Sequence, residues 1–365
     1  MVPWLTGPEA AGDPGRVHAE GRAARFALEE ARQQVATFFG ARPREVVFTS
    51  GGTEAVNMAV FGGVARARER GDGRPPHIVT TAVEHSAVLE AAQRAGRVTQ
   101  AGVDQLGRCD PEVVLAGLQP ETALVSVQLA NHEVGTLQPV AEIVAGARAR
   151  GVLTHVDACA GAGHVPVDFA ALDADLVSVT AHKFGGPRGV GALLVRRGLR
   201  LPPFHLGGAQ ERARRAGMEN VAAAVGFGAA ADELAAGDRL GQEAAAASAL
   251  TNRILTEVLA LLPGVSVFGD PVGRLPHLVC LGVDGVEAEP VLLALDQRGV
   301  AVHSGSSCSS ETFEPSPVLR AMGVDADHSL RVSVGWSSTA ADVDAFLAAF
   351  PDVVTRLREL RSGST

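Results

Sequence analysis

The sequence of 365 residues almost lacks lysine: Lys183 is the single one among 32 basic residues. Arginine replaces lysine wherever a long, solvated cation is enough, but its guanidinium does not release a proton and is a poor nucleophile. A desolvated lysine can lose its proton and attack a carbonyl group. Lys183 could have survived compositional drift by chance, but it follows an apolar run and precedes a glycine loop, in "LVSVTAHKFGGPRGVG". The sequence therefore predicts a site that needs a neutral amine.

Cysteine is also scarce. The four cysteines contain no C-x-x-C pair and no zinc-binding spacing, which favours a reduced, cytoplasmic setting. The chain starts with no basic segment before an apolar run, so no signal peptide is expected. The most apolar stretch, residues 221–231, is too short to span a bilayer, so no membrane partner is expected. The formal net charge of −9 speaks against nucleic acid and leaves small molecules and proteins as partners.

Short apolar runs alternate with helical patterns over the first half of the chain. Apolar residues recur at helical spacing from Val17 to Phe39, and runs such as "EVVFTS" and "HIVTTA" are typical of strands. This alternation predicts the α/β class, with a mostly parallel sheet between helices on both faces. A long Ala-rich helical region, about 219–262, then leads to a predicted smaller α+β unit. The expected parts are an N-terminal segment at 1–16, a large domain at 17–235 and a small C-terminal domain at 236–365.

Polar residues follow the ends of five predicted strands. Because ligands bind beyond the carboxyl ends of parallel strands, we expect these residues to gather at one edge. They are Ser50–Thr53, Glu84–His85, Asn131–Glu133, Asp157 and Thr180–Lys183. Gly52 and Thr53 open a helix whose free N–H groups and dipole favour a phosphate. Asp157 closes an apolar strand, where an acid needs a cationic partner such as the pyridinium nitrogen of pyridoxal phosphate (PLP).

Each of these residues also has a purely structural interpretation. Two glycines and a threonine are an ordinary helix entry, and Asp157 could cap a neighbouring loop. His85 and His132 could be histidines of the core or of loops, which is the commoner case for a single histidine. Their expected meeting with Lys183 at one edge of the sheet favours a PLP site over these alternatives.

Motifs along most of the chain resemble one family. Residues 12–350 contain, in order, "TSGGTEAVN", "VEHSAVLE", "LANHEVGTLQPV", "HVDA", "TAHKFGGPRGVGALLVRRG", "GGAQERARRAGMENVAAAVGFGAA" and "SGSSCSSETFEPSPVLRAMGV". They resemble the cysteine desulfurases, in the class-V aminotransferase branch of the fold-type-I PLP enzymes. The resemblance implies a large PLP-binding domain, a small C-terminal domain and a homodimer. The segment around Cys308 resembles the group with a long catalytic loop.

The resemblance also implies a role for each site residue. The residues implied for the cofactor are Lys183 as the Schiff-base lysine, Asp157 at the pyridine nitrogen, His85 stacked on the ring, His132 at the ring hydroxyl, and Gly52, Thr53, Thr180 and His182 at the phosphate. His85 would also be the proton shuttle, and Arg331 and Asn131 would bind the substrate. Cys308 would take sulfur from L-cysteine, release L-alanine and pass the persulfide sulfur to an acceptor protein, for example in iron–sulfur cluster assembly.

The sequence departs from the family pattern at four places. His132 stands where a second Asn is common and Ala160 where a Gln is usual, so hydrogen bonding to the ring hydroxyl is altered. Met218 replaces a threonine that often reaches the phosphate from the neighbouring subunit, which predicts weaker cofactor binding. The family's usual first strand, "Y-L-D-N-A-A-T-T", is missing from the start. Two alternatives stay open: a selenocysteine lyase-like enzyme, which is a close relative, and a non-catalytic scaffold or binding partner with the PLP fold, which the missing first strand suggests.

Overall fold

The computed structural model describes residues 1–7, 12–70, 75–304 and 316–362. The chain divides into two compact units. The first contains Met1–Ala101, Asp110–Leu129 and Pro139–Leu240, and the second contains Gly102–Cys109, Ala130–Gln138 and Gly241–Thr365. The domain limits expected after residues 16 and 235 stay a prediction. Asn131 and His132 belong to the second unit, although they follow a strand of the first.

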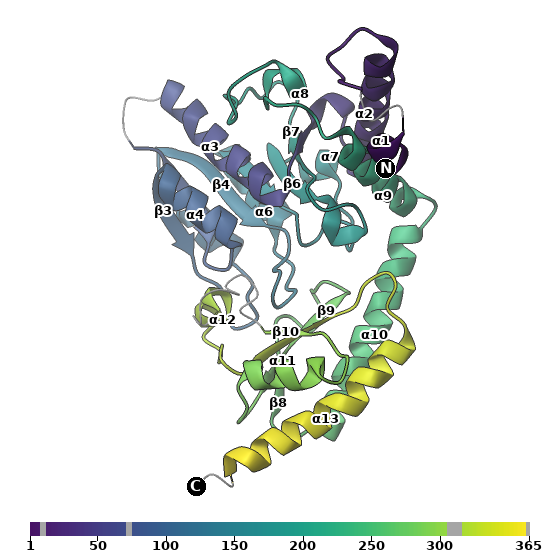
Figure 1. Ribbon diagram of the computed structural model, residues 1–365. Helices are drawn as coiled ribbons and strands as arrows, with labels where there is room; N and C mark the ends of the chain where they lie inside the picture. Colours follow the sequence, from purple (N-terminus) through teal and green to yellow (C-terminus); the bar gives the residue numbers. More distant parts are fainter. Residues whose placement is uncertain (8–11, 71–74, 305–315, 363–365) are drawn as a thin grey trace. The chain divides into compact units, whose positions relative to one another are not determined.

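The first unit is built around a seven-stranded sheet with the order β1-β7-β6-β5-β4-β2-β3 (Figure 1). Its strands are β1 (Val46–Thr49), β2 (His77–Thr81), β3 (Arg97–Ala101), β4 (Thr122–Gln128), β5 (Leu153–Asp157), β6 (Leu176–Thr180) and β7 (Gly191–Val195). The neighbours from β3 to β6 pair in parallel, whereas β7 is antiparallel to β1 and β6. The predicted α/β class with a mostly parallel sheet is confirmed.

The direction of β7 follows from the short connection that precedes it. A parallel pair needs a crossover of about a dozen residues or more, usually with a helix. Residues 181–190 contain the short 3-10 helix η3 (Ala181–Phe184), and the chain then pairs Gly191 with Thr180. This connection places Lys183 directly after the end of β6.

Helices cover both faces of this sheet. In β2, Ile78 belongs to a buried cluster with α3 and α4, whereas Val79 lies beside Gly117 at the end of α5. Since adjacent strand residues point to opposite faces, these helices form two layers, and α6 and α7 continue the layer of α5. The helices of this unit are α1 (Pro3–Thr6), α2 (Ala19–Phe38), α3 (Gly52–Arg70), α4 (Ser86–Ala95), α5 (Pro111–Ala116), α6 (Val140–Ala149), α7 (Phe169–Leu172), α8 (Gln210–Ala213) and α9 (Val221–Ala235).

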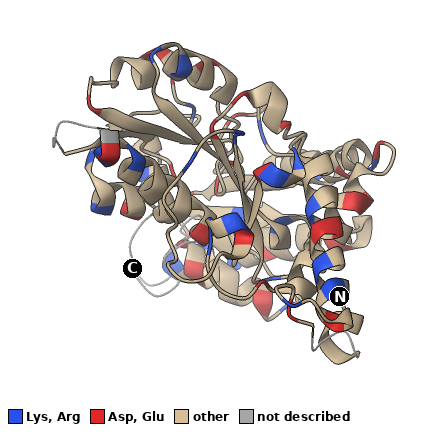
Figure 2. Ribbon diagram, turned by 90° about the horizontal axis from the view of Figure 1, so that it is seen from above, with Lys and Arg blue, Asp and Glu red and all other residues tan. Residues whose placement is uncertain are grey.

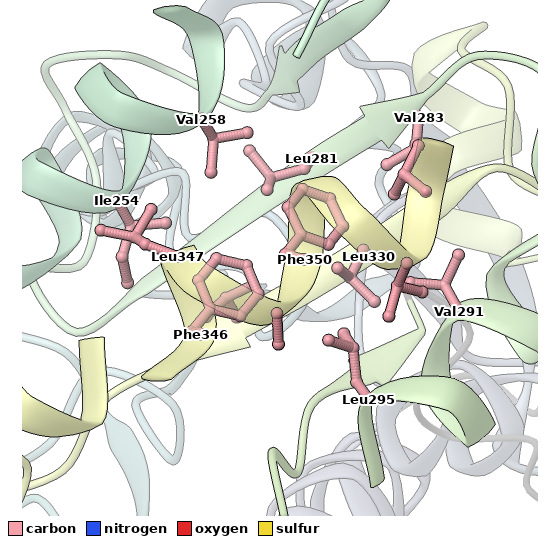
Figure 3. Close-up of a cluster of buried hydrophobic side chains, with 14 of the residues drawn as sticks. Ile254, Val258, Leu281, Val283, Val291, Leu295, Leu330, Phe346, Leu347 and Phe350 are labelled. Atoms are coloured by element: carbon pink, nitrogen blue, oxygen red, sulfur yellow. The ribbon is translucent and has the colours of Figure 1, made fainter. Parts of the chain in front are cut away.

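The second unit has a four-stranded antiparallel sheet with the order β10-β11-β9-β8. Side chains of this sheet and of α10, α11 and α13 form one buried cluster, in which Phe346 and Phe350 stack (Figure 3). The elements are β8 (Val265–Phe268), β9 (Leu278–Val283), β10 (His303–Ser304), β11 (Ser329–Ser333), α10 (Arg239–Leu261), α11 (Ala288–Asp296), α12 (Pro317–Met322) and α13 (Ala340–Ser362). The predicted small α+β unit is therefore present.

The Ala-rich region and the strand β3 differ from the sequence pattern. The Ala-rich region is divided into α9 and α10, with Gly237 between them at φ 58°, a left-handed conformation that glycine adopts without strain. The edge strand β3 has no predicted counterpart, because its residues are mostly exposed or half-buried and lack an apolar pattern.

Acidic and basic residues are interspersed along the ribbon (Figure 2). Among the described residues, no helix combines the length and the hydropathy that a membrane crossing requires. The same residues contain no group of His, Cys, Asp and Glu side chains that could hold a metal ion.

Candidate active site

The carboxyl ends of neighbouring strands bring several of the predicted cofactor residues together in the first unit. Gly191 of β7 pairs with Thr49 at the end of β1 and with Thr180 at the end of β6. Asp157, at the end of β5, pairs with Ser178 of β6 and Gln128 of β4. The strand ends that carry the predicted residues therefore share one edge of the sheet, as the sequence predicts.

The first turn of α3 lies close to the ends of β5 and β6. A Cβ added at Gly52 would lie 2.6 Å from Sγ of Cys159 and 3.6 Å from Cβ of Thr180. Glycine thus lets the helix start approach these residues, and Thr53 is exposed beside it. Because a helix start presents N–H groups and the positive end of its dipole, this position fits a phosphate.

Asp157 is a buried acid, 7% exposed. Its Oδ1 accepts a hydrogen bond from the N–H of Cys159 at 3.0 Å. With the described residues, Asp157 forms no ion pair. A buried carboxylate is costly unless a cation or enough donors compensate it. A pyridinium nitrogen would be such a cation, so the environment of Asp157 fits PLP.

Lys183 is exposed in η3, and its backbone carbonyl oxygen accepts a hydrogen bond. Nε2 of His164 donates to the carbonyl oxygen of Lys183 at 2.9 Å, and burial lowers the pKa of His164 to about 4. Oγ1 of Thr180 lies 3.0 Å from Nδ1 of His182. Burial, and the charges of Lys183 and Arg188, lower the pKa of His182. Two neutral histidines, His164 and His182, therefore lie beside Lys183 after the end of β6.

We expect Gly163→Ala to lower the free energy of unfolding by about 3 kcal/mol. Gly163 has φ 78°, and its added Cβ would lie 2.1 Å from Cβ of Phe184, next to Lys183. Gly151→Ala is the matched control, because Gly151 has φ 72° and no atom within 4 Å of the added carbon. The control should cost about 1 kcal/mol, from the backbone alone. Equal losses in urea unfolding would contradict a tight contact with Phe184.

His85 and Glu84 lie together at the entry to α4. Nδ1 of His85 accepts from the N–H of Ala87 at 3.0 Å, so the neutral ring carries its proton on Nε2. Glu84 is 1% exposed, and its Oε1 accepts from Oγ1 of Thr81 at 2.6 Å and from the N–H of Gln128 at 3.1 Å. These bonds join the ends of β2 and β4 and fix the chain that carries His85.

Glu84 should make stability depend on pH. Burial, and the negative charge of Asp157, raise the pKa of Glu84 from 4.5 to about 8. Between these values the unfolded chain releases a proton that the folded chain keeps, so the free energy of unfolding falls as pH rises. Above about pH 8 both states are ionised and the dependence ends.

Glu84→Gln removes this titration. Relative to the unchanged protein, the variant should gain roughly 1 kcal/mol of unfolding free energy per pH unit between about pH 5.5 and 7.5. Urea unfolding at both pH values measures this gain. Glu90→Gln, at an exposed position of α4, is the control. A gain that is the same at both pH values would contradict a raised pKa of Glu84.

Asn131 and His132 lie on one turn of the second unit, and Arg331 of β11 is bonded to that turn. Asn131 is buried, and its Oδ1 accepts from the N–H groups of Glu133 and Val134, both at 2.9 Å. Nη1 of Arg331 donates to the carbonyl oxygen of His132 at 3.0 Å. The side-chain oxygen of Asn131 thus helps to hold the turn itself. Substrate contacts of Asn131 and Arg331, and the ring contact of His132, stay predictions.

Cys308 lies outside the described residues, and its role as sulfur acceptor stays a prediction. Cys109 and Cys280 are buried, and burial raises the pKa of Cys280 to about 12. Cys159 has the same tendency: burial, and the negative charge of Asp157, raise the pKa of its thiol well above the ordinary value. At neutral pH the thiols of Cys159 and Cys280 are therefore protonated and poor nucleophiles.

Several residues near the site have no role predicted from the sequence. They are Cys159, Glu84 and His164, together with the ion pair in which Nε of Arg215 lies 2.9 Å from Oε1 of Glu54 in the first turn of α3. Glu84 follows a strand pattern, and a buried acid there could have been suspected. The contacts of His164 and Arg215 depend on chain segments far away in the sequence, so no local signal indicates them.

Comparisons with known proteins agree with this geometry. Residues 9–346 match the family described as "Aminotransferase class-V". A cysteine desulfurase of Cereibacter sphaeroides is 41% identical over 99% of this chain and 92% of its own length. A solved structure titled "NIFS-LIKE PROTEIN" superposes with a TM-score of 0.88 at 30% identity, over 98% of this chain and 94% of that one. Another, titled "SspA in complex with cysteine", has a TM-score of 0.77 at 25% identity, over 92% of this chain and 94% of that one.

The fold, the positions of the strand ends and the nearly full-length relatives therefore indicate the same family. Members of this family use PLP, and the surroundings of Lys183, Asp157 and the start of α3 fit that cofactor, as predicted. The chain belongs to the class-V aminotransferase family and, within it, to the cysteine desulfurases.

Proposed function

We propose that the protein is a PLP-dependent cysteine desulfurase that converts L-cysteine to L-alanine. The observation that carries the proposal is the meeting of Lys183, Asp157 and the start of α3 at one sheet edge, in a chain with desulfurase relatives over nearly its whole length. Cysteine as substrate is further supported by the solved SspA complex, whose title names it.

The cofactor supplies an electron-withdrawing ring for the α-carbon of the substrate when it is bound. Asp157 would stabilise the positive charge of the pyridine nitrogen, and Gly52, Thr53, Thr180 and His182 would bind the phosphate. The amine of Lys183 is the base for the α-proton, and His85 moves a proton from Nε2. His132 would contact the ring hydroxyl, and Arg331 and Asn131 would bind the substrate.

Cys308 is the sulfur acceptor in this proposal. Its thiolate attacks the sulfur of the substrate, a sulfur–sulfur bond forms, and the bond between Cβ and sulfur breaks. The electron pair of the broken bond stays on Cβ, which takes a proton to become the methyl group of alanine. A sulfur-acceptor protein then removes the persulfide sulfur. The proposal further includes transfer to such an acceptor protein, a homodimeric state of the enzyme and a cytoplasmic setting.

The test is the visible spectrum of the purified protein with PLP, recorded before and after L-cysteine is added, with alanine measured in the same tube. A cofactor band that changes with cysteine, together with alanine formation, is the expected result. A protein that binds no PLP but forms a stable complex would favour the scaffold alternative. A much higher rate with selenocysteine than with cysteine would favour the lyase alternative.

A further inference from the structure

Ser316 is the first described residue after the segment 305–315, which carries Cys308. It is fully buried and is the N-cap of α12, because its Oγ accepts from the N–H of Leu319 at 3.1 Å. The same Oγ donates to Oε2 of Glu133 at 2.5 Å. One hydroxyl therefore starts a helix and joins it to a carboxylate far away in the sequence.

Glu133 lies on a firmly held turn. The side chain of Asn131 accepts from two N–H groups of this turn, and Thr136 and Gln138 bond to the carbonyl oxygens of Leu106 and Gly107 at 2.5 and 2.7 Å. The side chain of Glu133 is itself buried, 1% exposed as a residue, so it needs hydrogen-bond donors. A short O–H···O bond to a carboxylate is among the stronger hydrogen bonds in proteins.

The predicted substrate-side residues lie on the same framework. Nε2 of His132 is 3.4 Å from Oε1 of Glu133, and Arg331 bonds to the carbonyl oxygen of His132. On the other side of the segment, His303 of β10 pairs with Arg331 of β11. The residues before the segment 305–315 thus belong to β10, which pairs with the strand that contains Arg331. The residue after the segment is Ser316, which is bonded to Glu133.

We propose that Glu133 is a positioning residue: by holding Ser316, it fixes the point at which the Cys308 segment rejoins the turn that carries Asn131 and His132. The inference rests on the proposed role of Cys308 as sulfur acceptor. Neither Glu133 nor Ser316 touches the reacting atoms in this proposal. They fix the residue at which the segment that carries Cys308 ends, so loss of the Ser316 hydroxyl should affect the sulfur-transfer step more than PLP binding.

The experiment compares four variants of the full chain loaded with PLP. Ser316→Ala removes the hydroxyl, Ser316→Thr keeps it, and Glu133→Gln keeps an acceptor oxygen without the charge. Thr339→Ala is the matched control, because Thr339 precedes α13 in the same unit and bonds to Asp342 instead. The readouts are PLP affinity, the rate at which persulfide appears on Cys308 after mixing with L-cysteine, and the rate at which iodoacetamide alkylates Cys308 without cysteine.

Ser316→Ala should slow persulfide formation about tenfold at saturating cysteine and raise the alkylation rate about threefold, with PLP affinity and KM little changed. Ser316→Thr should restore both rates, Glu133→Gln should lie between, and Thr339→Ala should match the unchanged protein. Unchanged rates in Ser316→Ala, or equal losses in Thr339→Ala, would overturn the proposal. If the unchanged protein makes no alanine, the proposed function fails, while the alkylation rates still decide whether Glu133 and Ser316 hold the segment.

Discussion

Lys183→Ala should lower the rate of alanine formation from L-cysteine by roughly 10³-fold or more, because no other amine can serve as the base. Lys183 is the one lysine of the chain, so no second lysine side chain can compensate. It also follows β6 closely, next to the neutral His182, and its carbonyl oxygen is bonded to His164. Lys183→Arg should lose as much activity as Lys183→Ala, since the guanidinium keeps the positive charge but cannot provide a neutral amine.

The solitary lysine permits an independent measurement of its bond to the cofactor. Borohydride reduction of the PLP-loaded protein, without any lysine-containing tag, should leave a phosphopyridoxyl group on the peptide that contains residue 183. Lys183→Ala and Lys183→Arg should show no such lysine adduct. Substantial alanine formation by Lys183→Arg, or a label elsewhere in the unchanged protein, would contradict the proposed role of Lys183.

Cys308→Ala should stop persulfide formation and lower alanine formation by roughly 10³-fold, while the cofactor band stays as in the unchanged protein. The physical reason is that sulfur needs a thiolate to receive it, and the thiols of Cys159 and Cys280 are held protonated by burial. Alkylation followed by mass spectrometry locates the persulfide, and alanine is measured in parallel. Cys308→Ser should behave like Cys308→Ala, because a hydroxyl cannot accept the sulfur.

Cys280→Ala and Cys159→Ala are the matched controls for this experiment. Cys280 is buried in β9 of the second unit, whereas Cys159 lies beside Asp157 and Gly52 in the candidate site. We expect Cys280→Ala to keep the persulfide on Cys308. If Cys308→Ala kept its activity and Cys159→Ala lost it, the sulfur acceptor would be Cys159, and the proposal for Cys308 would be wrong.

Most of the large unit was predictable because its signals are local. The apolar runs at β1, β2, β4, β5 and β6 and the helical spacing of α2 and α3 lie within single segments of the sequence. The start of α3 could be placed because two glycines and a threonine stand at the turn from β1. The antiparallel direction of β7 was not predicted, because the apolar run alone contains no information on direction, which depends on the short connection from β6. The break at Gly237 was not predicted, because an Ala-rich pattern does not indicate a single left-handed residue.

By itself, the sequence determined the family and predicted the chemistry, through its one lysine, acids that follow apolar strands, a glycine-rich helix start, and motifs that resemble the cysteine desulfurases. The tertiary structure alone decided how those groups are supported. Three hydrogen bonds join segments that are separated by 19 to 183 residues. They link His164 to Lys183, Glu84 to Gln128, and Glu133 to Ser316. Local patterns depend on neighbouring residues and can be read from the sequence, whereas such contacts exist only after strand order and packing have brought distant segments together.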